Sequence, residues 1–172
     1  MTVGFALTGS YCTFGEVFPV MELLCRDYTV TPIFSSNAAC TDSRFGTASE
    51  HLRRLMSLGG RKVITTIAEA EPLGPALPLD ALIIAPCTGN TLAKLAGGIT
   101  DTAVTMAAKA HLRSNRTLVI ALASNDALSA NLKNISTMLN RKNVFFVPME
   151  QDDPEKKPHS LVADFERMEE AV

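Results

Sequence analysis

Five short apolar segments alternate with stretches of helical spacing along this chain of 172 residues, and this alternation constrains its fold most. Segments so short and so uniformly apolar are typical of strands buried on both faces of a parallel sheet. Together they predict a single α/β domain over residues 1–172, with helices on both faces of five or six strands. The predicted strands are Val3–Leu7, Tyr28–Phe34, Ala81–Ile84, Thr117–Ala123 and Val144–Val147.

The strand order cannot be read directly, but the order 2-1-3-4-5 would bring the short polar loops of the chain to one edge of the sheet. These loops are residues 8–13, 35–47, 85–91 and 124–131. Open α/β sheets bind ligands beyond the carboxyl ends of their strands. We therefore expect one binding site at this edge.

The stretch Asp80–Asp101 contains the strongest local signal for such a site. We expect Pro86 to end the strand, and a turn of small and polar residues to lead into a helix from Thr91 that Gly97-Gly98 ends. The free N–H groups of a first helical turn favour anions. The turn is therefore either a ligand-binding loop or an ordinary capped loop, which is common in α/β proteins.

The remaining helices follow from apolar spacing and capping residues. Asp101 is expected to cap a helix that runs to about Arg113. Pro19 lies inside the first helical pattern, so that helix is expected to start late or to kink. Residues 149–160 read as a charged loop. The other predicted helices are Phe14–Asp27, Ala48–Leu58, Ser129–Arg141 and a terminal Leu161–Val172.

The loop after the first strand carries a weaker signal for phosphate. Gly9 permits a tight turn, and the hydroxyl groups of Ser10 and Thr13 suit either a helix cap or an oxyanion. The loop has neither a Walker sequence nor GxGxxG. Both interpretations therefore stay open on the residues alone.

Composition excludes several other classes of protein. A net charge of −2 without a basic patch argues against nucleic acid as a ligand, and no apolar run approaches the ~20 residues of a membrane span. The four cysteines form no CxxC pair, so we expect neither a metal site nor a disulfide framework. The N-terminus lacks the features of a signal peptide. A cytoplasmic location fits best.

Three motifs resemble those of the homo-oligomeric flavin-containing cysteine decarboxylase superfamily. They are Gly9-Ser10, the run from Ala85 to Lys94 with Gly98-Ile99-Thr100-Asp101, and Ser124-Asn125-Asp126. The resemblance implies a flavodoxin-like fold, an FMN-type site and a trimer-based homo-oligomer. It also implies cofactor-binding roles for Gly9, Ser10, Ser35, Ser36, Asn37, Phe45, Pro86, Thr88, Asn90 and Thr91.

A closer resemblance, along nearly the whole chain, is to one subunit of a two-subunit oxidoreductase. It rests on TGSYCT, TDSRFG, AEPLGP, APCTGNT, NDAL and FVPMEQDDPEKKPHSLVADF. This resemblance implies a partner subunit that carries NAD(P), a small dicarboxylate substrate, and a location in the mother cell of a spore-forming bacterium. Arg44 is the leading candidate for a substrate carboxylate. Asn125 and Lys157 are further substrate-binding candidates.

The catalytic residues are not identified. The decarboxylases carry a histidine shortly before their third strand, where this chain reads Glu71-Pro72-Leu73-Gly74. Cysteine decarboxylation is therefore disfavoured but kept as an alternative, beside a non-catalytic partner subunit with an empty flavin site. We interpret Cys12, Cys87 and His111 as packing residues.

Overall fold

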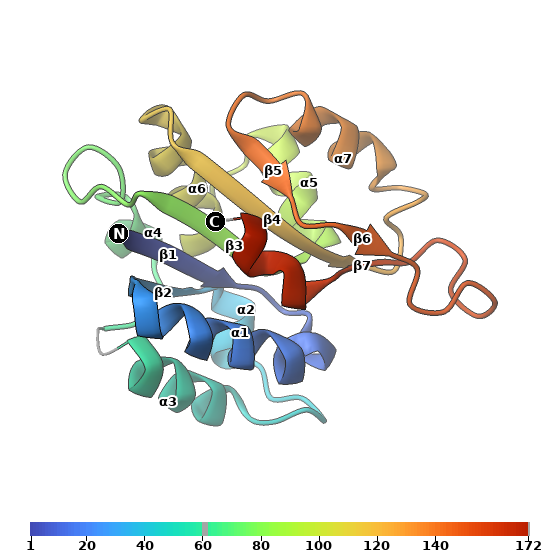
Figure 1. The fold of residues 1–172 in the computed structure, drawn as a ribbon, viewed down its shortest axis with the longest axis horizontal. Helices are drawn as coiled ribbons and strands as arrows, with labels where there is room; N and C mark the ends of the chain where they lie inside the picture. Colours follow the sequence, from blue (N-terminus) through green and yellow to red (C-terminus); the bar gives the residue numbers. More distant parts are fainter. Residues whose placement is uncertain (60–61, 172) are drawn as a thin grey trace.

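The computed structural model describes residues 1–59 and 62–171, and within these ranges seven strands form one sheet (Figure 1). The order is β2-β1-β3-β4-β7-β6, and β5 pairs with β4 beside this path. The first five strands pair in parallel, as β2-β1-β3-β4-β5, so the predicted order is confirmed. The strands are β1 (Thr2–Leu7), β2 (Thr29–Phe34), β3 (Ala81–Thr88), β4 (Thr117–Ser124), β5 (Val144–Phe146), β6 (Met149–Glu150) and β7 (Leu161–Ala163).

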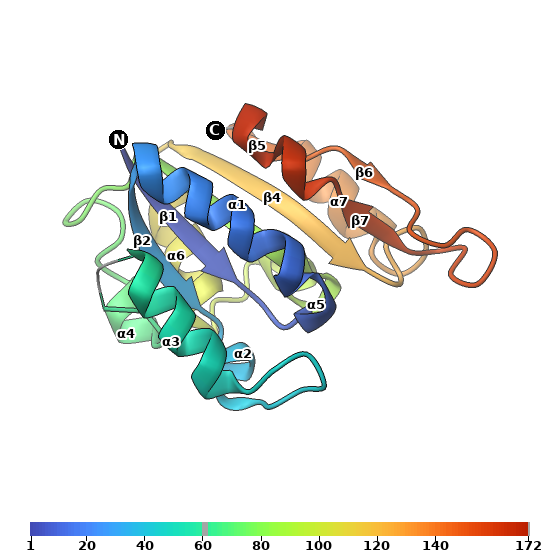
Figure 2. The same cartoon turned by 60° about the horizontal axis from the view of Figure 1, so that its bottom comes forward.

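Helices cover both faces of the sheet, in two layers that Figure 2 shows from the side of α1 and α3. One core packs α1–α3 and η2 against the sheet, and the other packs α4–α7 against the opposite face. The helices are η1 (Tyr11–Thr13), α1 (Phe14–Asp27), α2 (Ser36–Cys40), α3 (Ala48–Gly59), α4 (Ile67–Ala70), α5 (Gly89–Gly97), α6 (Ala103–Arg113), α7 (Leu132–Leu139) and η2 (Phe165–Ala171). None of the helices in the described ranges has the length and apolar character needed to span a bilayer.

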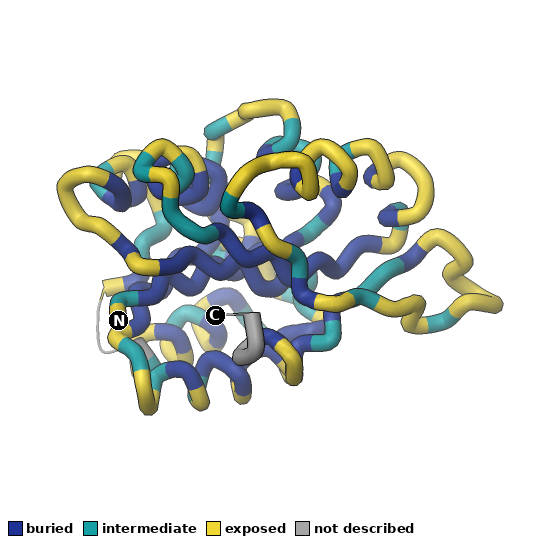
Figure 3. Tube along the Cα trace, turned by 45° about the horizontal axis from the view of Figure 1, so that its top comes forward, coloured by how far each residue is buried: buried dark blue, intermediate teal, exposed yellow. Residues whose placement is uncertain are grey.

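The central strands are buried on both faces, which explains their uniform apolarity (Figure 3). Along β3, Ile83 belongs to the core under α1, whereas Leu82 and Ile84 belong to the core under α5 and α6. Successive side chains of a strand point to opposite faces, so a strand with a core on each side needs apolar residues throughout.

Pro19 neither delays α1 nor stops it, so the expected late start is wrong. The helix runs from Phe14 to Asp27 with Pro19 inside it. A proline at this position deprives one carbonyl, that of Gly15, of its helical partner. Gly15 and Pro19 both lie on the exposed side of the helix. Water can therefore reach this carbonyl, which makes the proline tolerable.

Pro86 does not end β3, contrary to the prediction. The strand continues to Thr88, and α5 begins at Gly89, two residues earlier than expected. The Ala85-Pro86 peptide is cis, and the pairing of β3 with β4 shifts register between Ile84 and Cys87. Such an irregularity accepts a residue without an N–H group inside a strand.

The C-terminal prediction is also wrong in part. Within 149–160, Met149–Glu150 forms β6, and Leu161–Ala163 is a strand rather than the start of a helix. The β7 strand pairs antiparallel with Ala123 and Ser124 at the end of β4. Three residues carry too little periodicity to reveal this tertiary pairing. A 3-10 helix follows to Ala171, and Val172 lies outside the described residues.

Asp101 does not cap α6, because the adjacent Thr102 does. The Thr102 hydroxyl accepts a hydrogen bond from the N–H of Thr105 at 3.1 Å, and the Thr105 hydroxyl accepts one from the N–H of Thr102, also at 3.1 Å. Asp101 instead pairs with Lys94 at 2.8 Å. Gly98 closes α5 with φ +71°, as the sequence predicted.

We expect Thr102→Ala to lower the free energy of unfolding by about 1 kcal/mol, because it removes the cap of α6. Asp101→Ala is the matched control, and its effect should be smaller because it breaks only an exposed ion pair. Chemical denaturation of both variants measures the difference. A larger loss from Asp101→Ala would show that the cap is assigned to the wrong residue.

Candidate functional site

A polar cavity of about 540 Å³ opens at the carboxyl edge of the sheet, where the loops after β1, β2 and β3 converge. Its lining contains seven of the predicted cofactor residues: Gly9, Ser35, Ser36, Asn37, Thr88, Asn90 and Thr91. The lining also contains Thr8, Tyr11, Thr41, Lys94, Asp101 and Thr102, which the sequence did not single out as site residues. The volume lies within the range of roughly 300–1,000 Å³ that ligand sites occupy.

Thr8 joins the ends of two neighbouring strands at the base of this cavity. Its buried hydroxyl donates to the carbonyl of Pro86 at 2.7 Å and accepts from the N–H of Thr88 at 2.9 Å. The Thr8 N–H also donates to the Pro86 carbonyl, at 3.2 Å. Pro86 itself is buried and does not line the cavity. In the structure it therefore has a positioning role in the strand.

The loop after β2 is partly helical rather than irregular as predicted. Ser35 caps α2, and its hydroxyl accepts from the N–H of Ala38 at 3.3 Å. The Tyr11 hydroxyl donates to the carbonyl of Asn37 at 3.0 Å, which holds the first loop against the second. The two loops therefore form one continuous wall of the cavity.

The opposite wall is the first turn of α5. Thr88 caps this helix, and its hydroxyl accepts from the N–H of Thr91 at 3.2 Å. Lys94, one turn further along, pairs with Asp101, and this bond holds the pKa of the Asp101 carboxyl below its usual value. An ammonium group and a helix N-terminus thus border the same cavity, which favours an anionic ligand.

Four side chains of the lining have spare hydrogen-bonding capacity. Those of Ser36, Asn37, Thr41 and Asn90 make no hydrogen bond with any residue in the described ranges. The Ser10 hydroxyl lies just outside the lining, and its contact with the thiol of Cys12 is long, at 3.7 Å. These groups can bond to a ligand without breaking a bond of the fold.

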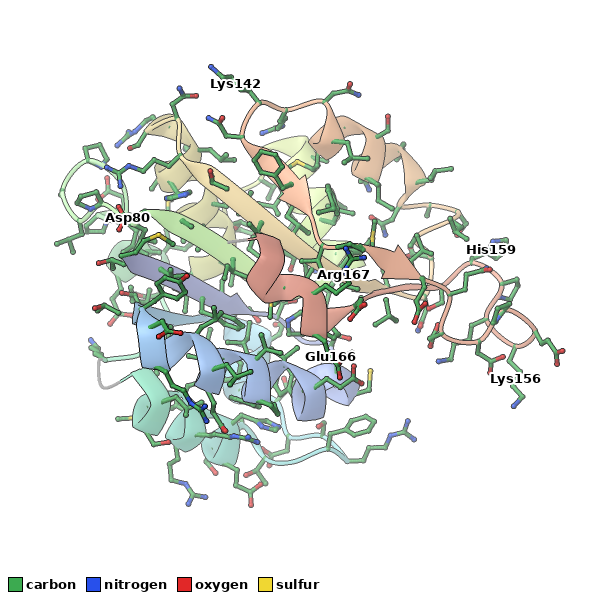
Figure 4. All side chains as sticks on the ribbon, viewed as in Figure 1. Asp80, Lys142, Lys156, His159, Glu166 and Arg167 are labelled. Atoms are coloured by element: carbon green, nitrogen blue, oxygen red, sulfur yellow. The ribbon has the colours of Figure 1, made fainter. Side chains whose placement is uncertain are left out.

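The remaining predicted site residues lie outside the cavity. Arg44 and Phe45 are exposed on the loop before α3, where the guanidinium group stacks on the ring at 4.8 Å. Asn125 is exposed beyond the end of β4. Lys157 forms an ion pair with Asp152 on the loop 151–160. This loop, in which Figure 4 labels Lys156 and His159, projects from the body of the protein. Their roles stay predictions.

Cys87 and His111 have the buried positions expected of packing residues. Burial raises the pKa of the Cys87 thiol far above its usual value, so this group is not a ready nucleophile. His111 is fully buried, with Nε2 at 2.7 Å from the Thr117 carbonyl, and burial lowers its pKa. Cys12 differs, because it is exposed on the first loop.

Two of the residues that the sequence analysis missed left a readable signal. Lys94 follows Asn90 by four residues, so the two share one face of α5. Thr8 lies between the end of β1 and the Gly9-Ser10 turn, so the sequence already places it at the end of that strand. The position of Asp101 could not be read, because Thr102 is an equally good capping residue and only the contact with Lys94 separates them.

Comparison with known proteins shows the family to which this chain is related. The Flavoprotein family matches residues 1–169 of this chain. The B subunit of dipicolinate synthase from Bacillus subtilis (strain 168) is 45% identical over 171 residues, which are 99% of this chain and 86% of the relative. The crystal structure of the corresponding dipicolinate synthase polypeptide from Bacillus halodurans C superposes with a TM-score of 0.89, at 42% identity, over 98% of this chain and 87% of that chain.

A dodecameric FMN-dependent Ubix-like decarboxylase from Escherichia coli O157:H7 shares the fold. The TM-score is 0.66 at 24% identity, over 86% of this chain and 80% of that one. The chain belongs to the Flavoprotein family. Within it, the chain is similar to the B subunit of dipicolinate synthase from end to end, which confirms the closer resemblance that the sequence motifs predicted.

We expect Thr8→Val to lower the free energy of unfolding by about 1–3 kcal/mol, because the N–H of Thr88 and the carbonyl of Pro86 lose a buried partner. Thr8→Ser keeps the hydroxyl and should cost less. Denaturant unfolding of both variants measures the two losses. Equal losses would mean that the methyl group, and not the bridge between the strands, stabilises this end of the sheet.

Proposed function

We propose that this chain is the flavin-site subunit of a dipicolinate synthase, and that it contributes to the oxidation of dihydrodipicolinate to dipicolinate during sporulation. The observation that carries the proposal is the polar cavity at the carboxyl edge of the sheet, in a chain similar to the B subunit of dipicolinate synthase over nearly all its length. Dihydrodipicolinate stands at the level of a lysine-pathway intermediate, and its oxidation requires a hydride acceptor.

The residues of the cavity fit FMN as the cofactor. A phosphate group would lie at Gly9 and Ser10, beside the start of η1 and α1, where Gly9 has no side chain and the Ser10 hydroxyl has only a long contact with Cys12. Thr88, Asn90 and the loop of Ser36 and Asn37 would hold the rest of the molecule. The spare donors and acceptors of three of these side chains support this assignment. When bound, a flavin supplies a two-electron acceptor.

We further propose that the chain acts with a second subunit that carries NAD(P), and that it forms a homo-oligomer in the cytoplasm of the mother cell. The name of the Bacillus subtilis relative supports a second subunit. The dodecameric neighbour from Escherichia coli supports an oligomer, since it shares this fold. Either the flavin or the partner's NAD(P) would accept the hydride.

Absorbance spectroscopy and equilibrium titration test the cofactor. We expect the purified chain to retain FMN through gel filtration and to bind added FMN more tightly than riboflavin, which lacks the phosphate. Ser10→Asp should weaken FMN binding by at least about tenfold, because it sets a carboxylate beside the phosphate, and should affect riboflavin much less. Ser57→Asp, on the exposed face of α3, is the matched control.

The outcome separates the proposal from its alternatives. A folded chain that ignores both flavins would exclude the flavin role and leave a non-catalytic partner subunit. A chain that binds FMN, yet releases carbon dioxide from a peptide with a C-terminal cysteine, would favour a decarboxylase. Equal weakening of FMN and riboflavin by Ser10→Asp would place the phosphate elsewhere in the cavity.

A further inference from the structure

A second cavity, of about 590 Å³, lies on the other side of Asn90 from the first. Its walls are the first turns of α5 on one side and the loop after β4 with the start of α7 on the other. Asn90 lines both cavities. A molecule in the second cavity would therefore lie next to whatever occupies the first.

Asp126 supplies the anionic group of this second cavity, and one of its two carboxylate oxygens already accepts hydrogen bonds. Its Oδ1 accepts from the hydroxyl of Ser124 at 2.5 Å and from the amide of Asn131 at 2.8 Å. No residue in the described ranges donates a hydrogen bond to the second oxygen, Oδ2. The two bonds to Oδ1 hold the pKa of Asp126 below its usual value, so the group is ionised at neutral pH.

The position of this carboxylate is fixed by close packing on Gly89. A Cβ atom at Gly89 would lie 2.3 Å from the Ser124 hydroxyl, 2.6 Å from the Asn131 amide nitrogen and 2.9 Å from the Asp126 carboxylate. The first residue of α5 must therefore be glycine for this polar cluster to exist. Because Asn90 is the next residue, the cluster and Asn90 are held in one rigid arrangement.

The same cavity also offers groups for a carboxylate. Lys133 lines it, and its side chain makes neither a hydrogen bond nor an ion pair with any residue in the described part of the chain. The Asn134 amide donates to the Asn131 side chain at 2.8 Å and keeps a second N–H for a ligand. One wall thus carries a free cation and amide donors, and Asp126 provides a fixed anion.

We propose that this cavity binds a small ring compound with a carboxylate and a protonated ring nitrogen, the carboxylate on Lys133 and Asn134 and the N–H of that nitrogen on Oδ2 of Asp126. The identification of this compound as the substrate rests on the proposed function; the cavity's preference for the N–H group does not. An aromatic ring with a bare nitrogen offers Asp126 only a lone pair, which an ionised carboxylate repels. Asp126 therefore favours a reduced ring whose nitrogen is protonated, and it favours the release of the aromatic product.

Binding of three matched probes to the full chain, measured by calorimetry without flavin, tests this inference. Piperidine-2,6-dicarboxylate carries a protonated ring nitrogen at neutral pH, cyclohexane-1,3-dicarboxylate replaces it with a methylene, and pyridine-2,6-dicarboxylate has a bare nitrogen. We expect the piperidine compound to bind at least about tenfold more tightly than either of the others, as a charge-assisted bond would give. Equal affinities for the three would overturn the proposal.

Two variants assign the contacts. Asp126→Asn keeps an oxygen for Ser124 and Asn131 but removes the charge, so it should abolish the preference for the piperidine compound. Lys133→Met should weaken all three probes by about the same factor and keep the preference, and its exposed position protects the fold. The matched controls are Asp27→Asn and Lys142→Met, both exposed and outside the cavity lining, and Figure 4 labels Lys142.

The results separate this inference from the flavin role. A chain that ignores FMN but prefers the piperidine compound keeps the second cavity and loses the cofactor. A chain that binds FMN but does not distinguish the probes keeps the cofactor and loses this cavity. Retention of the preference by Asp126→Asn, with circular dichroism showing an intact fold, would also overturn the assignment.

Discussion

The buried hydroxyl of Thr8 connects β1 to β3, and the walls of the first cavity depend on this connection. Its hydrogen bonds to Pro86 and Thr88 fix the positions of the two strand ends relative to each other. The next pair of strands is fixed by the backbone, since the N–H of Ser35 donates to the carbonyl of Leu7 at 3.0 Å. Thr88 and Ser35 then cap the helices that carry the cavity walls. A few hydrogen bonds between strand ends thus position loops that are distant in sequence.

The second cavity depends on a different contact, the packing of polar side chains on Gly89. Here the loop after β4 approaches α5 so closely that no side chain fits between them. The Ser124, Asp126 and Asn131 side chains satisfy one another, so the approach leaves little buried polarity without a partner. Asn90 is the residue that the two arrangements share, because it follows Gly89 and faces both cavities.

Much of this arrangement could be predicted, because parallel strands buried on both faces leave a plain trace in a sequence. The runs that became β1, β2 and β4 were placed to within a residue at each end, and seven predicted cofactor residues line one cavity. The continuation of β3 through Pro86 could not be predicted. The rule that a proline ends a strand fails here, because the pairing with β4 shifts register at this point and the sequence does not reveal that pairing. The polar cluster was missed for a related reason. Its residues follow neither the helical nor the strand spacing of apolar residues; they are Ser124, Asp126, Asn131 and Asn134. Gly89, on which these side chains pack, lies far away in the chain.

Charge explains why such a site would have two cavities rather than one. The proposed cofactor and the proposed dicarboxylate are both anions, and like charges a few ångströms apart repel strongly in a partly buried site. The first cavity has Lys94, whose charge is largely balanced by Asp101, together with a helix N-terminus. The second has Lys133, which forms no ion pair with any described acidic group, although the carboxylate of Asp126 lines the same cavity. A separate cation for each anion lets both bind, while Asn90, uncharged and shared, forms the boundary across which their reacting parts would meet.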